Sequence, residues 1–305
     1  MAGEAVMTVV SGEMYQWFMP LFIYTWKKAY PSADVVVFVR GGLSEGVKSV
    51  LSEMRSLHYL EGEWAVKGGI FDNFPKRHHL TNALRHLIPD KYLLRYDQVL
   101  ITDVDLLGFP VAITHWSYFG HVMRSTKLPY AAFRGPKRTF YRPEIAPMGW
   151  TGNFARLGCG TFMLHPKEWV RRTSKARAYY WKVLLGDQHD KYDHHRPGSY
   201  REYDEVMIAR ICTMSRLRIP GRRSCFVGGK PFDTRYRGVH LGDFKFKERY
   251  KNRRKMREII HKGVARQYVE IQKDEGWKNL LKKCDNCDFV SNMNHRAYNC
   301  CKAFI

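Results

Sequence analysis

The sequence predicts an α/β fold with a mainly parallel central sheet, and three observations support this prediction. Short apolar runs alternate with segments of helical periodicity through the first half of the chain. The intervals between the runs are long enough to hold a helix, which is the usual connection between parallel strands. A hydrophobic content of 45% in 305 residues is enough for a sizeable core. The alternation therefore indicates repeated β-α-β units.

The predicted strands are short runs rich in Val, Ile and other apolar residues. Two of them end in turn residues, Ser11-Gly12 and Gly41-Gly42. Continuous apolar runs of this kind are typical of strands that are buried on both faces of a parallel sheet. The predicted strands cover Met7–Val10, Asp34–Val39, Ala65–Phe71, Val99–Ile101 and Thr161–Leu164.

The predicted helices are longer segments in which apolar residues recur at helical spacing. Pro31 ends the first helix and Pro89 interrupts the third, because a proline disfavours the helical conformation of the residue before it. The predicted helices cover Trp17–Tyr30, Ser44–His58, Leu80–Leu94, a segment that begins at Pro166, and Glu202–Ile211.

Charge divides the chain into two parts, an α/β domain at 1–246 and a basic helical extension at 247–305. The segment 247–283 holds thirteen Lys or Arg against five Asp or Glu. The formal net charge of the whole chain is +22. Such an excess implies an anionic partner: a nucleotide, a nucleic acid, an acidic glycan or an anionic membrane surface.

The seven cysteines form no regular framework, which suits a reducing compartment. The sequence has no apolar run of about 18 residues and no secretion signal, so we expect a cytoplasmic protein. The unusual spacing of the tail cysteines favours free thiols. A structural zinc site at these cysteines stays open as an alternative. These cysteines are Cys284, Cys287, Cys300 and Cys301.

Two carboxylates, Asp103 and Asp105, follow the predicted strand Val99–Ile101. At the end of a strand this spacing points both side chains to one side and Val104 into the core. Hard divalent cations such as Mg²⁺ and Mn²⁺ prefer oxygen ligands, and substrate phosphates usually complete their coordination shell. The sequence therefore predicts a metal site at the carboxyl edge of the sheet, where open α/β sheets bind ligands.

A second motif places His240, Gly242 and Lys245 at His-x-Gly-x-x-Lys spacing. A neutral imidazole can be a further metal ligand. A glycine lets the backbone approach a phosphate closely, and a lysine supplies a compact positive charge. Together, the two motifs describe a site for a metal ion and a diphosphate.

These motifs resemble those of nucleotide-sugar glycosyltransferases with the GT-A fold, most closely glycosyltransferase family 8. The resemblance covers about Met7 to Lys245, with the motifs in the expected order. It implies a Rossmann-like nucleotide-sugar-binding domain and metal-dependent hexosyl transfer from a nucleotide diphosphate donor. The donor would be a UDP-sugar and the anomeric configuration would be retained. The acceptor would be a glycan, a protein or a lipid-linked sugar.

The resemblance also implies roles for particular residues. Asp103, Asp105 and His240 would be the ligands of Mn²⁺ or Mg²⁺, and Tyr15 would stack on the base. Asp204 and Glu205 would be catalytic, with Asp204 bonded to the hydroxyls of the donor sugar. The residues implied in donor binding are Val10, Ser11, Gly12, Tyr15, Arg85, Thr102, Asp103, Val104, Gly242 and Lys245.

Glu205 departs from the family pattern, which has an amide at this position. A carboxylate here could act as the nucleophile of a retaining enzyme or as the general base of an inverting one. The net charge keeps two other functions open: glycosylation of a base in DNA, and nucleic-acid binding without catalysis. Peripheral association with an anionic membrane through the basic extension would be compatible with catalysis.

Overall fold

The computed structural model confirms the mixed α/β class. It describes residues 3–56, 60–74, 80–110, 114–132, 136–137, 156–157, 161–187, 203–218, 226–227, 230–231, 238–245, 256, 260–284 and 287–305. The chain divides into two compact units that interleave along the sequence. Unit 1 consists of Met1–Val9, Phe71–Thr102 and Trp116–Phe232, and unit 2 of Val10–Ile70, Asp103–His115 and Asp233–Ile305.

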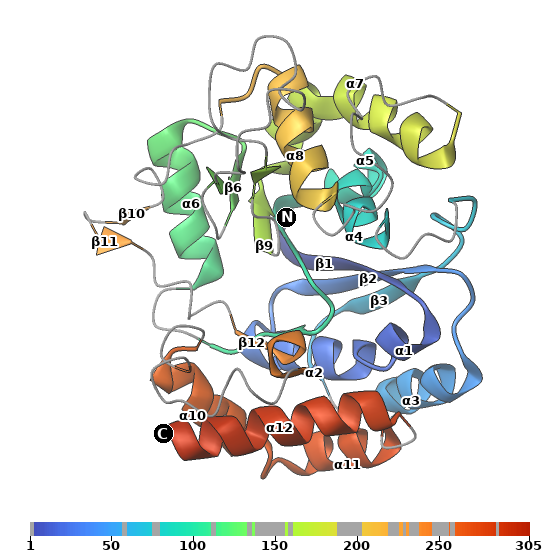
Figure 1. Ribbon diagram of the computed structural model, residues 1–305, viewed down its shortest axis with the longest axis vertical. Coiled ribbons are helices and arrows are strands. Elements are labelled where there is room, and N and C mark those ends of the chain that lie inside the picture. The colour runs from blue at the N-terminus through green and yellow to red at the C-terminus, as the bar shows by residue number, and fades with distance from the viewer. Residues whose placement is uncertain are drawn as a thin grey trace. The chain divides into compact units, whose positions relative to one another are not determined.

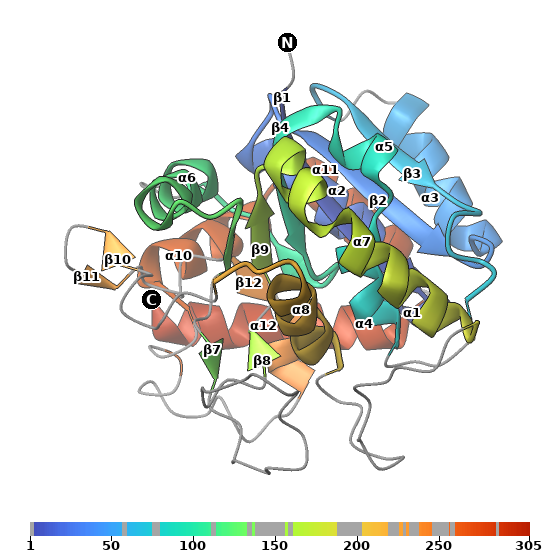
Figure 2. The same cartoon turned by 90° about the horizontal axis from the view of Figure 1, so that it is seen from above.

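Unit 1 is built on four strands in the order β1-β4-β9-β6. Their bounds are β1 (Gly3–Ser11, with its last two residues in unit 2), β4 (Tyr96–Thr102), β9 (Thr161–Leu164) and β6 (Tyr130–Ala132). β1 and β4 are parallel, with Val6 opposite Leu100, whereas β9 is antiparallel to both of its neighbours (Figure 2). All four residues of β9 are buried, as we expect for a strand inside a sheet.

The helices of unit 1 are α4 (Leu80–Leu84), the 3-10 helix η1 (Arg85–Leu87), α5 (Asp90–Leu93), α6 (His115–Thr126, whose first residue is in unit 2), α7 (Pro166–Leu185) and α8 (Tyr203–Met214). α7 packs against β4 and α8, and α8 packs against α4. Pro166 begins α7 and Gly186, in the left-handed conformation, ends it. Two short antiparallel pairs join β7 (Pro136–Lys137) to β8 (Arg156–Leu157) and β10 (Phe226–Val227) to β11 (Lys230–Pro231).

Unit 2 contains the parallel pair β2 (Asp34–Arg40) and β3 (Trp64–Lys67) and the antiparallel pair β5 (Leu106–Leu107) and β12 (Val239–His240). Its helices are α1 (Glu13–Gln16), α2 (Met19–Ala29), α3 (Glu45–Ser56), the 3-10 helix η6 (Leu241–Lys245), α10 (Lys262–Ile271), α11 (Glu275–Cys284) and α12 (Asp288–Phe304). α2 packs on β2, and α12 packs against α10, α11 and η6 (Figure 1).

Two element predictions need correction. The strand expected over Ala65–Phe71 ends at Lys67, because Gly68 and Gly69 follow and Gly69 adopts a φ of 82°. The helix expected over Leu80–Leu94 is three short helical pieces rather than one. The basic extension is helical where the structure describes it, with the three helices α10, α11 and α12, and 247–255, 257–259 and 285–286 lie outside the described residues.

The domain boundary between residues 246 and 247 stays a prediction. In the part of the chain that the structure describes, no helix has the length and apolar character needed to cross a membrane.

Candidate functional site

The two aspartates lie in the turn that follows β4, as predicted. The backbone N–H of Leu106 donates to the carbonyl oxygen of Asp103 at 3.2 Å, which closes the turn into β5. Val104 between them is 6% exposed, whereas both aspartates are only half-buried. The alternation expected from the i, i+2 spacing is therefore observed.

His240 reaches the aspartates through the pairing of β12 with β5. In this pairing His240 lies opposite Leu106, and the N–H of Leu241 donates to the carbonyl oxygen of Asp105 at 2.8 Å. The imidazole Nε2 lies 3.2 Å from Asp105 Oδ1. One ligand atom from each of Asp103, Asp105 and His240 lies within 4.8 Å of the others.

Gly242 lies against this cluster, where a larger residue would displace the carboxylate of Asp105. A Cβ atom added to Gly242 would lie 2.5 Å from Asp105 Oδ2 and 3.3 Å from His240 Cε1. The absence of a side chain at Gly242 therefore lets the backbone of η6 lie close to the carboxylate without displacing it. Lys245 ends η6, and its side chain lies outside the described part of the structure.

The chemistry of these side chains fits a divalent cation. Two ionised carboxylates beside a neutral imidazole carry a charge of about −2, and a divalent ion would neutralise it. Carboxylate oxygens suit Mg²⁺ and Mn²⁺, whereas imidazole favours transition metals, so the combined set is compatible with Mn²⁺. Among the residues that the structure describes, this is the single group with the geometry of a metal site.

Tyr15 lies close enough to Asp105 and Asp103 for their charges to change the pKa of its phenol. Burial raises the pKa of its phenol, and the charges of Asp105 and Asp103 raise it further, so the hydroxyl stays protonated. Its ring packs against Phe18 and Phe289, with centroid distances of 5.9 and 6.2 Å. The phenol is therefore held in place and can donate a hydrogen bond.

The turn before Tyr15 contains the other predicted residues of the first β-α connection. Gly12 has a φ of 85°, in the region that favours glycine, and precedes α1. Ser11 is half-buried, but Val10 is 1% exposed. Val10 can therefore contact a bound donor mainly through its backbone atoms. Thr102, at the end of β4, is also buried, with its Oγ1 3.4 Å from that of Thr161.

In unit 1, the structure joins two residues that the sequence predicted separately. Arg85 Nη2 donates to Asp204 Oδ2 at 2.8 Å, and the two side chains are only 5% and 11% exposed. Arg85 comes from η1 and Asp204 from the first turn of α8, the helix that packs against α4. The adjacent Glu205 is half-buried.

Two further buried residues of unit 1 support Arg85, and sequence reasoning missed both. Arg177 of α7 donates from Nε to the carbonyl oxygen of His86 at 3.2 Å, and also bonds to the carbonyl of Ile88 and to Asp90. These bonds fix the C-terminal end of η1 beside Arg85. Burial, and then the charges of Arg85 and Arg177, hold the pKa of His86 well below its usual value. No local signal could have identified Arg177, because its partners lie about ninety residues away.

The zinc alternative for the tail cysteines is wrong for the described residues. Cys287 precedes α12 while Cys300 and Cys301 lie in its last turns. Cys300 lies thirteen positions after Cys287 along this helix, a rise of about 20 Å, so the two cannot share one ion. Cys284 and Cys301 are fully buried, and burial raises the pKa of the Cys301 thiol to about 12.

Comparison with known proteins gives matches among solved structures only. No family model and no curated protein matches the sequence. The galactosyltransferase LgtC is 15% identical over 68% of this chain and 70% of its own, with a TM-score of 0.43. The bifunctional glycosyltransferase WbbM is 12% identical over 97% of this chain, with a TM-score of 0.49. The glycosyltransferase GlyE of Streptococcus pneumoniae is 10% identical over 68% of this chain, with a TM-score of 0.38.

The chain spans about half the length of two of these proteins, 52% of WbbM and 43% of GlyE. All three are glycosyltransferases, the class that the sequence motifs resemble. Because the identities and TM-scores are low, we base the function on the residues of this chain.

Proposed function

We propose that this chain is a metal-dependent glycosyltransferase that moves a hexosyl group from a nucleoside diphosphate sugar to a glycan acceptor. The proposal rests above all on the cluster of Asp103, Asp105 and His240, with Gly242 closely packed against it. We favour a UDP-sugar as donor, Mn²⁺ as cation and retention at the anomeric carbon. We also infer a cytoplasmic setting, since the described cysteines are thiols rather than disulfides.

The cluster would hold the cation, which supplies positive charge for the departing diphosphate when it is bound. Gly242 keeps the backbone of η6 against Asp105, so a diphosphate on this side could meet backbone N–H groups as well as the ion. Lys245, at the end of η6, would add a second positive charge. The protonated phenol of Tyr15 would donate a hydrogen bond or stack on the base.

Asp204 and Glu205 would act on the sugar. The bond from Arg85 fixes the orientation of the Asp204 carboxylate, so Asp204 is suited to accept hydrogen bonds from sugar hydroxyls. Glu205 would attack the anomeric carbon as the bond to the diphosphate oxygen breaks. The acceptor oxygen would then displace Glu205, with net retention, as its proton passes to the released diphosphate. If Glu205 instead takes the proton of the acceptor hydroxyl, one displacement inverts the configuration.

The test begins with donor binding. Thermal unfolding would be followed with UDP-, GDP-, CDP-, ADP- and TDP-sugars, each with Mn²⁺, Mg²⁺ or EDTA. We expect stabilisation by UDP-sugars only when metal is present, because a ligand that binds the native state raises its stability. A shift with DNA or RNA but none with any nucleotide would instead favour a nucleic-acid-binding protein.

Catalysis is tested by the release of UDP and by transfer to glycan acceptors. We expect Asp103→Asn and Asp105→Asn each to lower turnover by about a hundredfold or more, the scale of a lost electrostatic contribution to the transition state. Asp97→Asn removes an exposed carboxylate from β4, the strand that precedes the two aspartates, and is the matched control. Equal turnover in Asp105→Asn and Asp97→Asn would rule out the metal assignment.

A further inference from the structure

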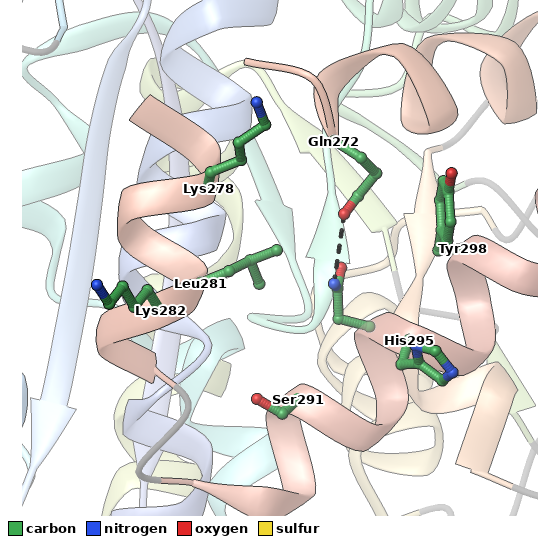
Figure 3. Close-up of a pocket in the computed structure, with 8 residues that line it drawn as sticks. Gln272, Lys278, Leu281, Lys282, Ser291, His295 and Tyr298 are labelled. Atoms are coloured by element: carbon green, nitrogen blue, oxygen red, sulfur yellow. Dashed lines mark hydrogen bonds between the residues drawn. The ribbon is translucent and has the colours of Figure 1, made fainter. Parts of the chain in front are cut away.

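Unit 2 has a cavity whose residues are separate from the metal cluster. The cavity has a volume of about 420 Å³ and lies between α11 and α12, next to the end of α10 (Figure 3). This volume is within the range of small-molecule sites in proteins. It is lined by Gln272, Lys278, Leu281, Lys282, Ser291, Asn294, His295 and Tyr298.

The spacing of these residues shows that each helix presents one face to the cavity. Lys278, Leu281 and Lys282 follow the i, i+3, i+4 pattern on α11. Ser291, Asn294, His295 and Tyr298 follow i, i+3, i+4, i+7 on α12. The apolar packing of α11 and α12 uses other positions, such as Leu280 and Met293, and the cavity lies on a more exposed side of the pair, where Lys278, Lys282 and His295 are exposed. Only Leu281 of its lining is aliphatic, and Figure 3 shows it pointing from α11 toward α12.

The lining is polar and positively charged. It contains two lysine ammonium groups, an imidazole, two hydroxyls and two amides, and none of the eight residues carries a carboxylate. Lys278 does bond to Glu275, one turn away, at 2.6 Å, but both side chains are at least half exposed. An exposed pair of this kind contributes little free energy and is readily exchanged for another anion.

Buried hydrogen bonds fix one wall of the cavity. The buried Tyr268 donates from its hydroxyl to Asn294 Oδ1 at 2.5 Å. Burial and the neighbouring Cys301 raise the pKa of Tyr268 well above its usual value, so this phenol remains a donor. Asn294 in turn donates from Nδ2 to Gln272 Oε1 at 3.4 Å, the bond drawn in Figure 3. The amide groups therefore have set orientations before any ligand arrives.

We propose that this cavity binds a phosphorylated sugar. The lysines Lys278 and Lys282 would hold the phosphate, and the fixed amides with the hydroxyls of Ser291 and Tyr298 would bond to the sugar hydroxyls. The volume exceeds what a lone phosphate needs, and the single aliphatic side chain argues against an acyl chain. The proposal does not depend on the glycosyltransferase activity, since it uses none of the residues of the metal cluster.

Isothermal titration with glucose 6-phosphate, inorganic phosphate and glucose tests the proposal, in EDTA so that the metal cluster is empty. We expect glucose 6-phosphate to bind at least about tenfold more tightly than inorganic phosphate, since charge-assisted and neutral hydrogen bonds add to each other. Glucose alone should bind too weakly to measure. Equal affinity for glucose 6-phosphate and inorganic phosphate would reduce the cavity to a general anion site and overturn the proposal.

A pair of double variants separates the cavity from the general effect of net charge. Lys278→Gln with Lys282→Gln should weaken binding of glucose 6-phosphate by about tenfold, because two charged contacts from exposed side chains are lost. Lys262→Gln with Lys273→Gln removes the same charge from exposed lysines outside the cavity and should leave binding within about twofold. Equal losses in both double variants would contradict the proposed site.

Discussion

The metal cluster of unit 2 and the Arg85–Asp204 pair of unit 1 differ in how their charges are balanced. The cluster brings two carboxylates to a half-buried imidazole, so its negative charge exceeds what the imidazole can balance. In the ion pair, the guanidinium and the carboxylate neutralise each other away from solvent. The cluster is therefore suited to bind a cation, whereas the charges of the pair already neutralise each other. A ligand should change the first, and a substitution should damage the second.

The largest effect that we predict is on stability, at the buried pair. Arg85→Ala leaves the carboxylate of Asp204 buried without its guanidinium, which should lower the free energy of unfolding by about 3–5 kcal/mol. Denaturant unfolding measures this change. Arg95→Ala, at an exposed arginine of the same unit, should cost less than about 0.5 kcal/mol.

Removing both charges of the pair then distinguishes its contribution to stability from its contribution to function. Arg85→Met with Asp204→Leu should recover most of the lost stability, because no unpaired charge is left in the core. The recovered protein should still be inactive. Full transferase activity in this double variant would show that the pair has only a structural role.

A smaller effect is expected at the metal cluster, where Gly242→Ala should weaken Mn²⁺ binding about tenfold. The added methyl group would lie 2.5 Å from Asp105 Oδ2, so the carboxylate must turn away from its ligating position. Titration with Mn²⁺, followed by electron paramagnetic resonance, measures the affinity. Gly68→Ala is the control, since a Cβ at Gly68 has no atom within 4 Å. Unchanged affinity in Gly242→Ala would place the ion elsewhere.

The smallest effect concerns pH, and it arises beside the buried pair. His86 has a lowered pKa in the folded state, so below about pH 6.5 the unfolded chain binds a proton that the folded chain does not. Its contribution to stability is therefore complete above pH 6.5 and decreases by up to about 1.4 kcal/mol per pH unit below it. Denaturant unfolding between pH 7 and 5 measures the slope.

His86→Gln should reduce this pH slope, since glutamine does not titrate. His121→Gln replaces an exposed histidine of α6 and should leave the slope unchanged. The same slope in wild type and His86→Gln would assign the pH dependence to other groups.

The sequence predicted contacts well where they depend on short-range periodicity. Val104 between the two aspartates is buried because a strand end alternates its side chains, and this alternation can be read from three residues. The bounds of β2 and β9 follow equally from local apolar runs. β3 ends at Lys67, before Gly68 and Gly69. These glycines indicate the end of a strand, but the apolar Ile70 and Phe71 that follow them favoured a longer strand.

Contacts over long separations could not be predicted from periodicity. Arg85 and Asp204 are 119 residues apart, and neither has a neighbour that identifies its partner. His240 was assigned to the cluster through a family motif, and the backbone pairing that delivers it depends on the whole unit. The spacing of the tail cysteines favoured free thiols but left a zinc site open. The length of α12 separates Cys287 from Cys300 and removes that alternative.

The interleaving of the two units has a consequence for the order of events during synthesis. Asp103 and Asp105 leave the ribosome about 135 residues before His240, the last ligand of the cluster. At about 5–20 residues per second, the interval is roughly 7 to 27 s. Throughout that interval the nascent chain carries two carboxylates without the strand that brings their third partner. The nascent chain therefore gains its complete metal site only after synthesis has passed His240, near the start of the third segment of unit 2.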